Sequence, residues 1–510
     1  MSTWGGARLI AAGILLSRIS GLVRQKVIAW FLGDGDAADA LASAFRIPNF
    51  LQNLFGEGVL SASFIPAYSK LIADGKREEA GRVAGAVFSL LALTTSVLVL
   101  VGMLGSPLLV DLIAPGFDGT KRDLTVRLVR LIFPGVGLLV LSAWCLGVLN
   151  SHRRFFLSYV SPVLFNATMI VALIAAGPGR TPEQIVLIAA WGSVAGSLAQ
   201  LLVQLPAVRR LDSALVFRPQ ASPIVRGVAS RFGTVVVGRG VVQISGFVDT
   251  AIASLVGAGA VATLGYAQAL SMLPVSLFGM SISAAELPAM AGETGSADEV
   301  ARALRVRLDR GLGRIAYFVI PSAIAFLMLG GVMAAGLYQG GAFSAESARW
   351  VWAALAGSAV GLLAGTMGRL YSSTSYAMGD ANTPLKFAIV RVSLGAALGW
   401  SLSLSLPGLL GIDARWGIAM LTGASGVAAW VEFQLLRGAI SRRIGATGVP
   451  LGQLVRLWGC AILAGLASFA AARAMLGQPP IVVAAVAVPV FGAIYVGLTR
   501  LLGVDDARRA

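Results

Sequence analysis

The chain has 510 residues, of which 57% are hydrophobic and 13% are charged, and its formal net charge is +16. Soluble domains carry about 25% charged residues, so this composition excludes an ordinary soluble protein. Recurring apolar runs of about 18 residues or more predict membrane-spanning helices and argue against a β-barrel. The basic residues are spread over short loops, which argues against a nucleic-acid-binding domain.

Taken in chain order, the apolar runs predict an all-α polytopic membrane protein with about 14 transmembrane helices. We expect the first run to stay in the protein, because it is long, carries arginines and lacks a clear small-residue cleavage site. The expected spans are 8–32, 38–68, 82–112, 125–149, 156–177, 184–206, 226–256, 262–288, 312–337, 348–378, 384–405, 414–437, 452–475 and 480–502.

The loops between the spans alternate between basic and nearly free of cations. Cytoplasmic loops are the ones enriched in lysine and arginine, so the alternation predicts that both termini are cytoplasmic. The basic set includes Lys70, Lys76, Arg77, Arg153, Arg154, Arg209, Arg210, Arg302, Arg305, Arg310, Arg437, Arg442 and Arg443.

The sequence also repeats itself. The segment ISGLV at 19–23 recurs as ISGFV at 244–248, and NLFGEGVLSASFIPA at 53–67 is echoed by SLFGMSISAAELPAM at 276–290. Because the offset covers six expected helices, both copies have the same orientation in the membrane. This pattern predicts two halves related by an axis along the membrane normal.

The repeat defines the expected organisation of the chain. Residues 1–220 and 221–440 would each form a six-helix lobe, and residues 441–510 would add two transmembrane helices and a short tail. Transporter sites lie near the bilayer midplane where such halves meet, and broken helices mark them. One span carries Pro48 and the Gly56-Glu57-Gly58 break, and its counterpart in the second half carries Pro274 and Gly279, so these spans are expected to line a central cavity.

The first two spans carry charge in mid-span: Arg18, Arg24 and Lys26 in one, Arg46 and Glu57 in the other. A charge at the bilayer centre costs about 2.5–3.5 kcal/mol on insertion scales, so such a group normally faces a partner or a wet cavity. The alternative is that these arginines reach toward the membrane surface or pair with Glu57.

One helical stripe of the first span is small and polar around a single cation. Ser17, Gly21 and Arg24 are spaced i, i+4, i+7, and Ser20 lies beside them. Guanidinium groups bind phosphate through two parallel hydrogen bonds, so the arginines of the first half could hold a diphosphate.

The second half offers fewer charges within its spans. They are Arg239, Asp249 and Glu286, and the repeat places Asp249 at the position equivalent to Arg24. Arg391 lies near a span end, where reaching to the membrane surface explains it better than function. A cation-rich lobe facing a poorer one suits a substrate whose anionic group is bound mainly from one side.

The segments SRISGLVRQ and DALASAFRIPNFLQNLFGEGVLSASFIPAY, with an acidic turn between them, resemble the N-terminal signature of the MurJ (MviN) family. That family comprises lipid II flippases of the multidrug/oligosaccharidyl-lipid/polysaccharide exporter (MOP) superfamily. The resemblance implies an alternating-access transporter of the bacterial cytoplasmic (inner) membrane, whose cavity arginines engage the substrate's diphosphate.

Carried over residue by residue, Ser17, Arg18, Arg24, Asp39 and Glu57 match the pattern of the family. Arg46 falls where a basic residue is common, and Arg239 is a candidate to compensate for cavity arginines that this chain lacks. The departures from the family pattern are Gln25, Gln52, Gln268 and Ala269, the second and fourth of which stand where arginines are usual.

Two further positions also resemble the family. Arg369 lies inside a span, and Asp380 lies in the GDANTP turn that follows it. Asp before Asn-Thr-Pro is favourable turn chemistry, so Asp380 is expected to cap the turn. The alternative is that Asp249 and Asp380 share in a site for a monovalent cation such as sodium, since carboxylate oxygens suit hard ions.

No GxxxxGK[ST] loop and no catalytic constellation is present, so the sequence predicts a transporter and no enzyme. The leading hypothesis is a lipid II flippase for cell-wall synthesis, acting as a monomer without a cofactor other than a coupling cation. The alternatives are an exporter of another lipid-linked oligosaccharide, a cation-coupled drug antiporter, and a non-transporting scaffold of the cell-wall machinery.

Overall fold

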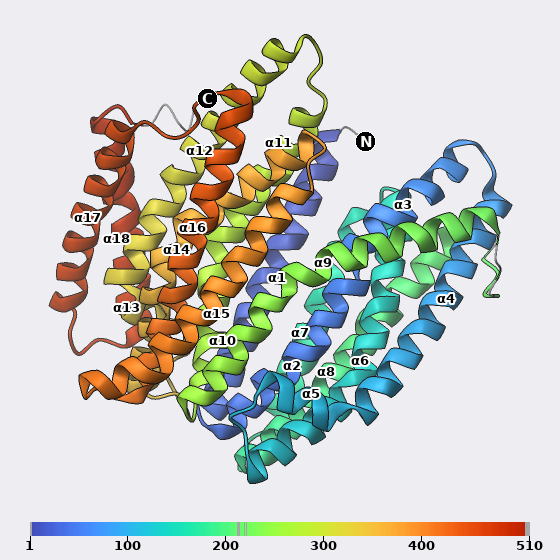
Figure 1. The fold of residues 1–510 in the computed structure, drawn as a ribbon. Helices are drawn as coiled ribbons and strands as arrows, with labels where there is room; N and C mark the ends of the chain where they lie inside the picture. The colour runs from blue at the N-terminus through green and yellow to red at the C-terminus, as the bar shows by residue number, and fades with distance from the viewer. Residues whose placement is uncertain (1–2, 212–214, 219, 221, 505–510) are drawn as a thin grey trace. The chain divides into compact units, whose positions relative to one another are not determined.

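The computed structural model describes residues 3–211, 215–218, 220 and 222–504. Its description leaves out the side chains of the helical residues 3–12, 14, 48, 57, 234, 235 and 237–243. Over the described residues the chain is helical, without β-strands and with one isolated bridge between Gly340 and Phe343. The prediction of an all-α fold is confirmed (Figure 1).

The chain divides into two compact units, Met1–Phe247 and Val248–Ala510. The helices that begin in the first unit are α1 (Thr3–Leu32), α2 (Asp36–Phe55), α3 (Glu57–Ala73), α4 (Arg77–Leu104), α5 (Ser106–Ile113), α6 (Gly119–Ser151), α7 (Phe155–Ala176), α8 (Pro182–Leu211) and α9 (Pro223–Val256). The second unit holds the end of α9, then α10 (Ala260–Pro274), the π-helix η1 (Val275–Met280), α11 (Ser281–Ala291), α12 (Ala297–Met328), α13 (Gly330–Tyr338), α14 (Ala345–Ala377), α15 (Asn382–Leu410), the 3-10 helix η2 (Ala414–Trp416), α16 (Gly417–Ile444), α17 (Leu451–Ala474) and α18 (Pro480–Leu501).

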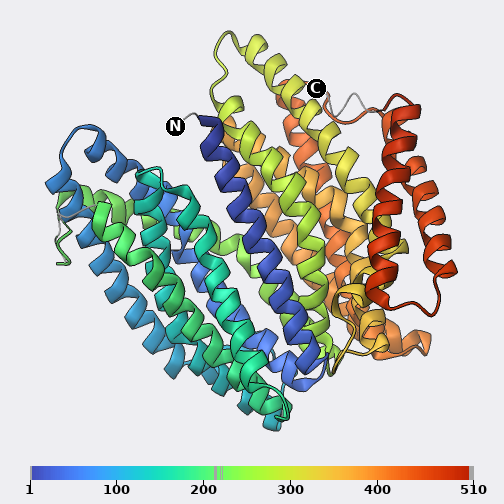
Figure 2. The same cartoon turned by 180° about the vertical axis from the view of Figure 1, so that it is seen from behind.

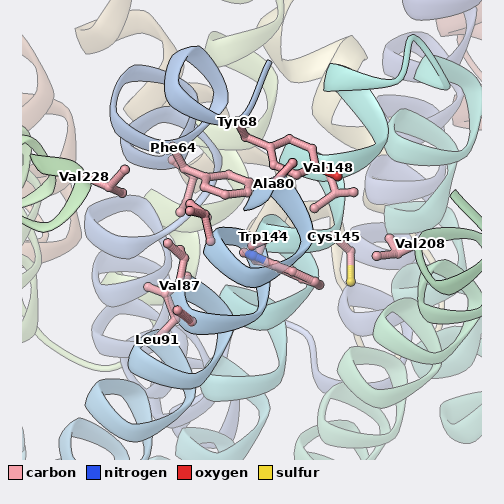
Figure 3. Close-up of a cluster of buried hydrophobic side chains, with 14 of the residues drawn as sticks. Phe64, Tyr68, Ala80, Val87, Leu91, Trp144, Cys145, Val148, Val208 and Val228 are labelled. Carbon is pink, nitrogen blue, oxygen red and sulfur yellow. The ribbon is translucent and has the colours of Figure 1, made fainter. Parts of the chain in front are cut away.

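The boundary between the units lies within α9, further along the chain than the expected division near residue 220. The reason is a hydrophobic core in the first unit that recruits the start of this helix. Val228 of α9 belongs to the same buried cluster as Phe64 of α3, Leu91 of α4 and Trp144 of α6 (Figure 3). Burying this apolar face fixes the beginning of α9 to the first unit.

The two copies of the sequence repeat are both interrupted at the same motif. The helix pair α2–α3 breaks at Gly56, where a side chain would place its Cβ 2.2 Å from the Gln52 carbonyl oxygen. In the second copy, the π-helix η1 interrupts the helix around Gly279, whose Cβ would lie 2.4 Å from Thr366. The next span of each half is broken too, between α4 and α5 and between α12 and α13.

Each of the expected spans corresponds to a helix or to a broken helix. By length and composition, eleven of the described helices could cross a membrane, so the exact number of fourteen stays a prediction. That count covers only described residues. The expected spans outside it correspond to α1 and α9, which include residues whose side chains are not described, and to α2–α3, which the glycine break divides into two short helices.

Helices α14 and α16 of the second unit cross at close range. A Cβ on Gly361 of α14 would lie 2.3 Å from the Cα of Gly426, so both backbones need glycine to come this near. The hydroxyl of Thr422 on α16 also donates to the Ala354 carbonyl of α14, at 2.9 Å. Such close glycine contacts are typical of packing between membrane helices.

The last two helices belong to the second unit. In Figures 1 and 2, α17 and α18 lie side by side against α12 and α13. The Tyr495 hydroxyl of α18 donates to the Tyr317 carbonyl of α12, at 2.7 Å. The linker before α17 is fixed as well, because the Gly448 N–H donates to Asp309 Oδ1 of α12, at 2.8 Å. This part of the chain was expected to be an appendage of the lobes.

Candidate functional site

The polar stripe of α1 faces α7. Asn166 Nδ2 of α7 donates to Ser20 Oγ at 2.8 Å, and that hydroxyl donates in turn to the Ser17 carbonyl at 2.9 Å. Gly21 lies against the same asparagine, since a Cβ there would be 3.9 Å from Asn166 Nδ2. The stripe that the sequence predicts is therefore a packed polar contact within the first unit, with Arg24 at one end.

Arg24 is held by packing while part of its hydrogen-bonding capacity stays unused. Its guanidinium carbon lies 5.5 Å from the centre of the Phe165 ring of α7, a cation–π contact. Its Nε is buried and finds no acceptor among the described residues. A buried N–H without an acceptor is costly, and in a native protein it asks for an explanation such as a ligand.

For the other expected site residues of the first half, the structure gives fewer contacts than for Arg24. Arg18 of α1 is exposed, in contrast to Arg24. Arg46 of α2 is half-buried, with its Nη1 3.8 Å from where a Cβ on Gly246 of α9 would lie. Glu57 and Arg239 lie on described helices, but their side chains are outside the described part of the structure.

Asp39 serves as an anchor between helices. Its Oδ2 is 2.6 Å from Lys121 Nζ, and Asp36 Oδ1 is 2.8 Å from the same nitrogen. Asp39 is fully buried, whereas the Asp36 side chain is 63% exposed. The ion pairs join the beginning of α2 to the beginning of α6. Lys121 also has acidic neighbours in its own loop, Asp118 and Asp123, but its ion pairs are with Asp36 and Asp39.

A pocket in the second unit collects several of the remaining charged residues. It is lined by Asp249, Gln268, Arg369 and Arg391, from α9, α10, α14 and α15. Asp249 Oδ1 accepts a hydrogen bond from the Ser425 hydroxyl of α16, at 3.2 Å. The structure thus brings Asp249 and Arg369 to one pocket, which the sequence did not predict.

Arg391 was expected to reach toward the membrane surface. Instead, its Nη1 lies 3.2 Å from Oε2 of Glu432, which is buried on α16. A signal for this pair was present in the sequence. Arg391 follows the start of one expected span by about two turns, and Glu432 precedes the end of the next span by a little over one turn. In antiparallel neighbours these positions lie at a similar depth.

Asp380 caps the turn between α14 and α15. Its Oδ1 accepts from the backbone N–H groups of Asn382 and Thr383, at 3.1 and 3.0 Å, and its Oδ2 accepts from the Thr383 hydroxyl at 2.7 Å. Arg443 completes the set with an Nη2–Oδ2 distance of 2.6 Å. The expected turn cap is present. Asp380 is not among the described residues that line the pocket of Asp249.

Replacing Asp380 by asparagine is expected to destabilise the protein above about pH 4 and to have little effect near pH 2. The hydrogen bonds from Thr383 and the ion pair with Arg443 lower the pKa of Asp380 from 3.8 to about 2. A carboxyl whose pKa is depressed by folding stabilises the fold above its unfolded pKa, and that contribution is lost as the pH falls through the folded pKa. Thermal unfolding of both proteins in detergent between pH 2 and pH 7 measures this.

The control is Arg443→Gln, which removes the ion pair and keeps the turn's own hydrogen bonds. Its loss of stability should be smaller than that of Asp380→Asn at neutral pH. A difference between wild type and Asp380→Asn that stays constant down to pH 2 would contradict the assignment.

The arrangement of the helices defines the class of the protein. A multidrug resistance MATE family transporter of the MOP superfamily, in its inward-facing conformation, has the same fold, with a TM-score of 0.65 and 18% identity over 83% of this chain and 95% of that one. The structure titled "Lipid II flippase MurJ, inward closed conformation" matches with a TM-score of 0.78 and 20% identity, over 98% of this chain and 99% of that one. The chain therefore shares the polytopic helical fold of these two proteins.

Sequence comparison then gives the family. The family model described as "Lipid II flippase MurJ" matches residues 28–484, and the chain belongs to this family. The lipid II flippase MurJ of Burkholderia cenocepacia is 31% identical over 505 residues, 96% of this chain and 95% of that protein. The probable lipid II flippase MurJ of Rhizobium tropici is 32% identical over 461 residues, 89% of this chain and 82% of that protein.

Proposed function

We propose that this protein carries lipid II, the lipid-linked peptidoglycan precursor, from the inner to the outer leaflet of the bacterial cytoplasmic membrane. Membership of the MurJ family and relatives named as lipid II flippases support this function. The alternating basic loops support an orientation with both termini in the cytoplasm. In this proposal the protein works by alternating access, as a transporter and without catalytic chemistry.

The observation that carries the proposal is the state of Arg24. A guanidinium with a buried, unused N–H is expensive to keep inside a membrane protein, and binding an anionic headgroup would supply the missing acceptor. Ser17 and Arg18 lie on the same helix, and Arg46 lies on α2 of the same unit. Phosphate oxygens are the acceptors that guanidinium groups bind best, so the diphosphate of the substrate is the group assigned to these arginines.

Coupling to a monovalent cation such as sodium stays a prediction. The Ser425 hydroxyl beside Asp249 offers one further oxygen ligand. Two guanidinium groups in the same pocket, those of Arg369 and Arg391, act against a bare cation there. The monomeric state and an association with the cell-wall synthesis machinery also stay predictions.

The likeness to a multidrug transporter favours one alternative, a cation-coupled drug antiporter of the same superfamily. If this chain were such an antiporter, its overproduction would make cells resistant to cationic dyes. An exporter of another lipid-linked oligosaccharide shares the basic stripe and differs in the sugar that it accepts. A non-transporting scaffold would need none of the arginines.

Expression of this chain in a bacterium depleted of its own lipid II flippase is expected to restore growth and cell shape. The measurement is colony formation, together with the amount of lipid II that reaches the outer leaflet, at a verified level of the protein in the membrane. An empty vector and an active flippase set the two ends of the scale. Resistance to cationic dyes without rescue would favour the drug antiporter.

A wild-type chain that reaches the membrane and fails to rescue would contradict the proposal. The residues to examine would then be Gln52 and Ala269, which stand where the family commonly has arginines. Rescue by Gln52→Arg/Ala269→Arg would show that the fold is competent and that this chain carries a different substrate.

A further inference from the structure

The pocket of the second unit has a volume of about 200 Å³ and lies wholly within that unit. The glycine crossing of α14 and α16 lines part of it, because Gly361 and Gly426 bring the two backbones together without side chains. Ser271 and Val275, around the start of η1, line it from the α10 side. Irregular turns of this kind inside helices are frequent at functional sites.

The charges around Arg369 are unevenly paired. Arg369, Arg391 and Asp249 all line the pocket. The Glu432 carboxylate forms an ion pair with Arg391 at 3.2 Å, and Asp249 Oδ1 accepts a hydrogen bond from the Ser425 hydroxyl at 3.2 Å. Among the described residues, neither carboxylate forms an ion pair with Arg369. A guanidinium group without a counter-charge is expensive in a membrane protein.

Arg369 is the group of this cluster that can receive such a counter-charge. Its side chain is exposed although its helix neighbours are buried, so it projects into accessible space. Within the described part of the chain, no hydrogen bond or ion pair holds its guanidinium. Its five N–H groups form a planar fork that matches a carboxylate or a phosphate.

The hydroxyl groups that line the pocket already donate hydrogen bonds within the second unit. Four of them donate to a backbone carbonyl of their own or the adjacent helix, and the fifth donates to Asp249. In this order they belong to Ser271, Ser358, Thr366, Thr422 and Ser425. A hydroxyl that donates in this way keeps lone pairs, so these walls can accept hydrogen bonds from a ligand. The strong donors in the pocket are the guanidinium groups, which match an anionic group on the ligand. The hydroxyl acceptors match N–H or O–H groups next to that anionic group.

We propose that this pocket is a binding site for a small oxyanion, a carboxylate or a phosphate, held by Arg369. The acceptor-lined walls favour an oxyanion with a neighbouring N–H donor, as at the carboxyl end of a short peptide. The cavity volume of about 200 Å³ lies below the range of about 300–1,000 Å³ that is typical of pockets for drug-sized ligands. The pocket therefore suits a small group. Two sources supply this chemistry: a peptide carboxylate, as on a peptide-bearing substrate, and a phosphate from solution or from a lipid headgroup.

Titration calorimetry on the purified full chain in detergent tests the site without relying on transport. The probes are inorganic phosphate, the dipeptide alanylalanine and its amide, which keeps the ammonium and lacks the carboxylate. We expect saturable binding of phosphate, of alanylalanine or of both, and no comparable binding of the amide. Arg369→Gln should weaken that binding about tenfold or more, because a hydrogen bond to a charged group is worth about 1.5–3 kcal/mol. Arg369→Lys should retain part of it.

The matched control is Arg349→Gln, the same change on the same helix at an exposed arginine that does not line the pocket. It should bind as the wild type does. Tighter binding of alanylalanine than of phosphate assigns the peptide source, and the reverse order assigns the phosphate source. Absence of saturable binding of either probe would overturn the proposal. So would equal losses in Arg349→Gln and Arg369→Gln, or undiminished binding in an Arg369→Gln protein that unfolds at the wild-type temperature. If Arg369→Gln does not fold, the comparison rests on Arg369→Lys, and undiminished affinity there overturns the proposal.

Discussion

Replacing Arg24 by methionine is expected to abolish rescue of a flippase-depleted cell while leaving the protein as stable as the wild type or more so. Methionine keeps an apolar stem against Phe165 and removes a buried N–H that lacks an acceptor, which costs about 1–3 kcal/mol when unmet. Losing a charged hydrogen bond to the substrate is worth about 1.5–3 kcal/mol, or roughly 10- to 150-fold in transport. Outer-leaflet lipid II and thermal unfolding in detergent provide the two measurements.

The opposite signs of the two effects separate a functional arginine from a structural one. If Arg24 only packs against Phe165, its removal should lower the stability of the protein. Transport per folded molecule should then stay at the wild-type level. Arg127→Met provides the control, since Arg127 is an exposed arginine on α6 of the same unit. Transport at the wild-type level by Arg24→Met would remove Arg24 from the proposed mechanism. A variant that no longer folds would assign Arg24 to the structure.

The hydrophobic pattern predicted most of the fold because apolar length is a property of each segment alone. Each expected span has a helix, and the LFG motif of the repeat marked both interruptions, Gly56 and the π-helix around Gly279. The helices with mid-span charges, α1 and α2, also form where the apolar pattern places them, although such charges are costly in a membrane.

The site was harder to predict because charges pair between segments that are distant in sequence. Lys121 lies near Asp118 and Asp123 in its own loop, whereas its ion-pair partners Asp36 and Asp39 begin α2. Arg391 was judged by its distance from a helix end, whereas its partner Glu432 lies on the neighbouring helix α16. Asp380 was predicted correctly because a turn cap depends on residues that follow at once. Interactions between neighbouring residues could be inferred from the sequence. Ion pairs between helices could not, because they depend on which helices pack together.

Replacing Lys121 by methionine is expected to be among the most destabilising single changes in the first unit. The lysine neutralises Asp39, which is fully buried, with 2.6 Å between Nζ and Oδ2. Removing one partner of a buried ion pair costs about 3–5 kcal/mol, because the remaining charge has neither water nor its counter-ion. The helices joined here are the first turns of α2 and α6, so the loss should appear as a lower unfolding temperature and a lower yield in detergent.

Two further variants show whether burial or the contact itself is responsible. Asp36→Asn removes an ion pair of nearly the same length, 2.8 Å, but on a side chain that is 63% exposed, so it should cost less than about 1 kcal/mol. Lys121→Met/Asp39→Asn removes both buried charges and should recover most of the stability lost in Lys121→Met. Equal effects of Asp36→Asn and Lys121→Met, or no recovery in the double variant, would contradict this account. Asp39 would then have to act through its other contacts within the first unit, and the ion pair at the start of α2 would be incidental to the fold.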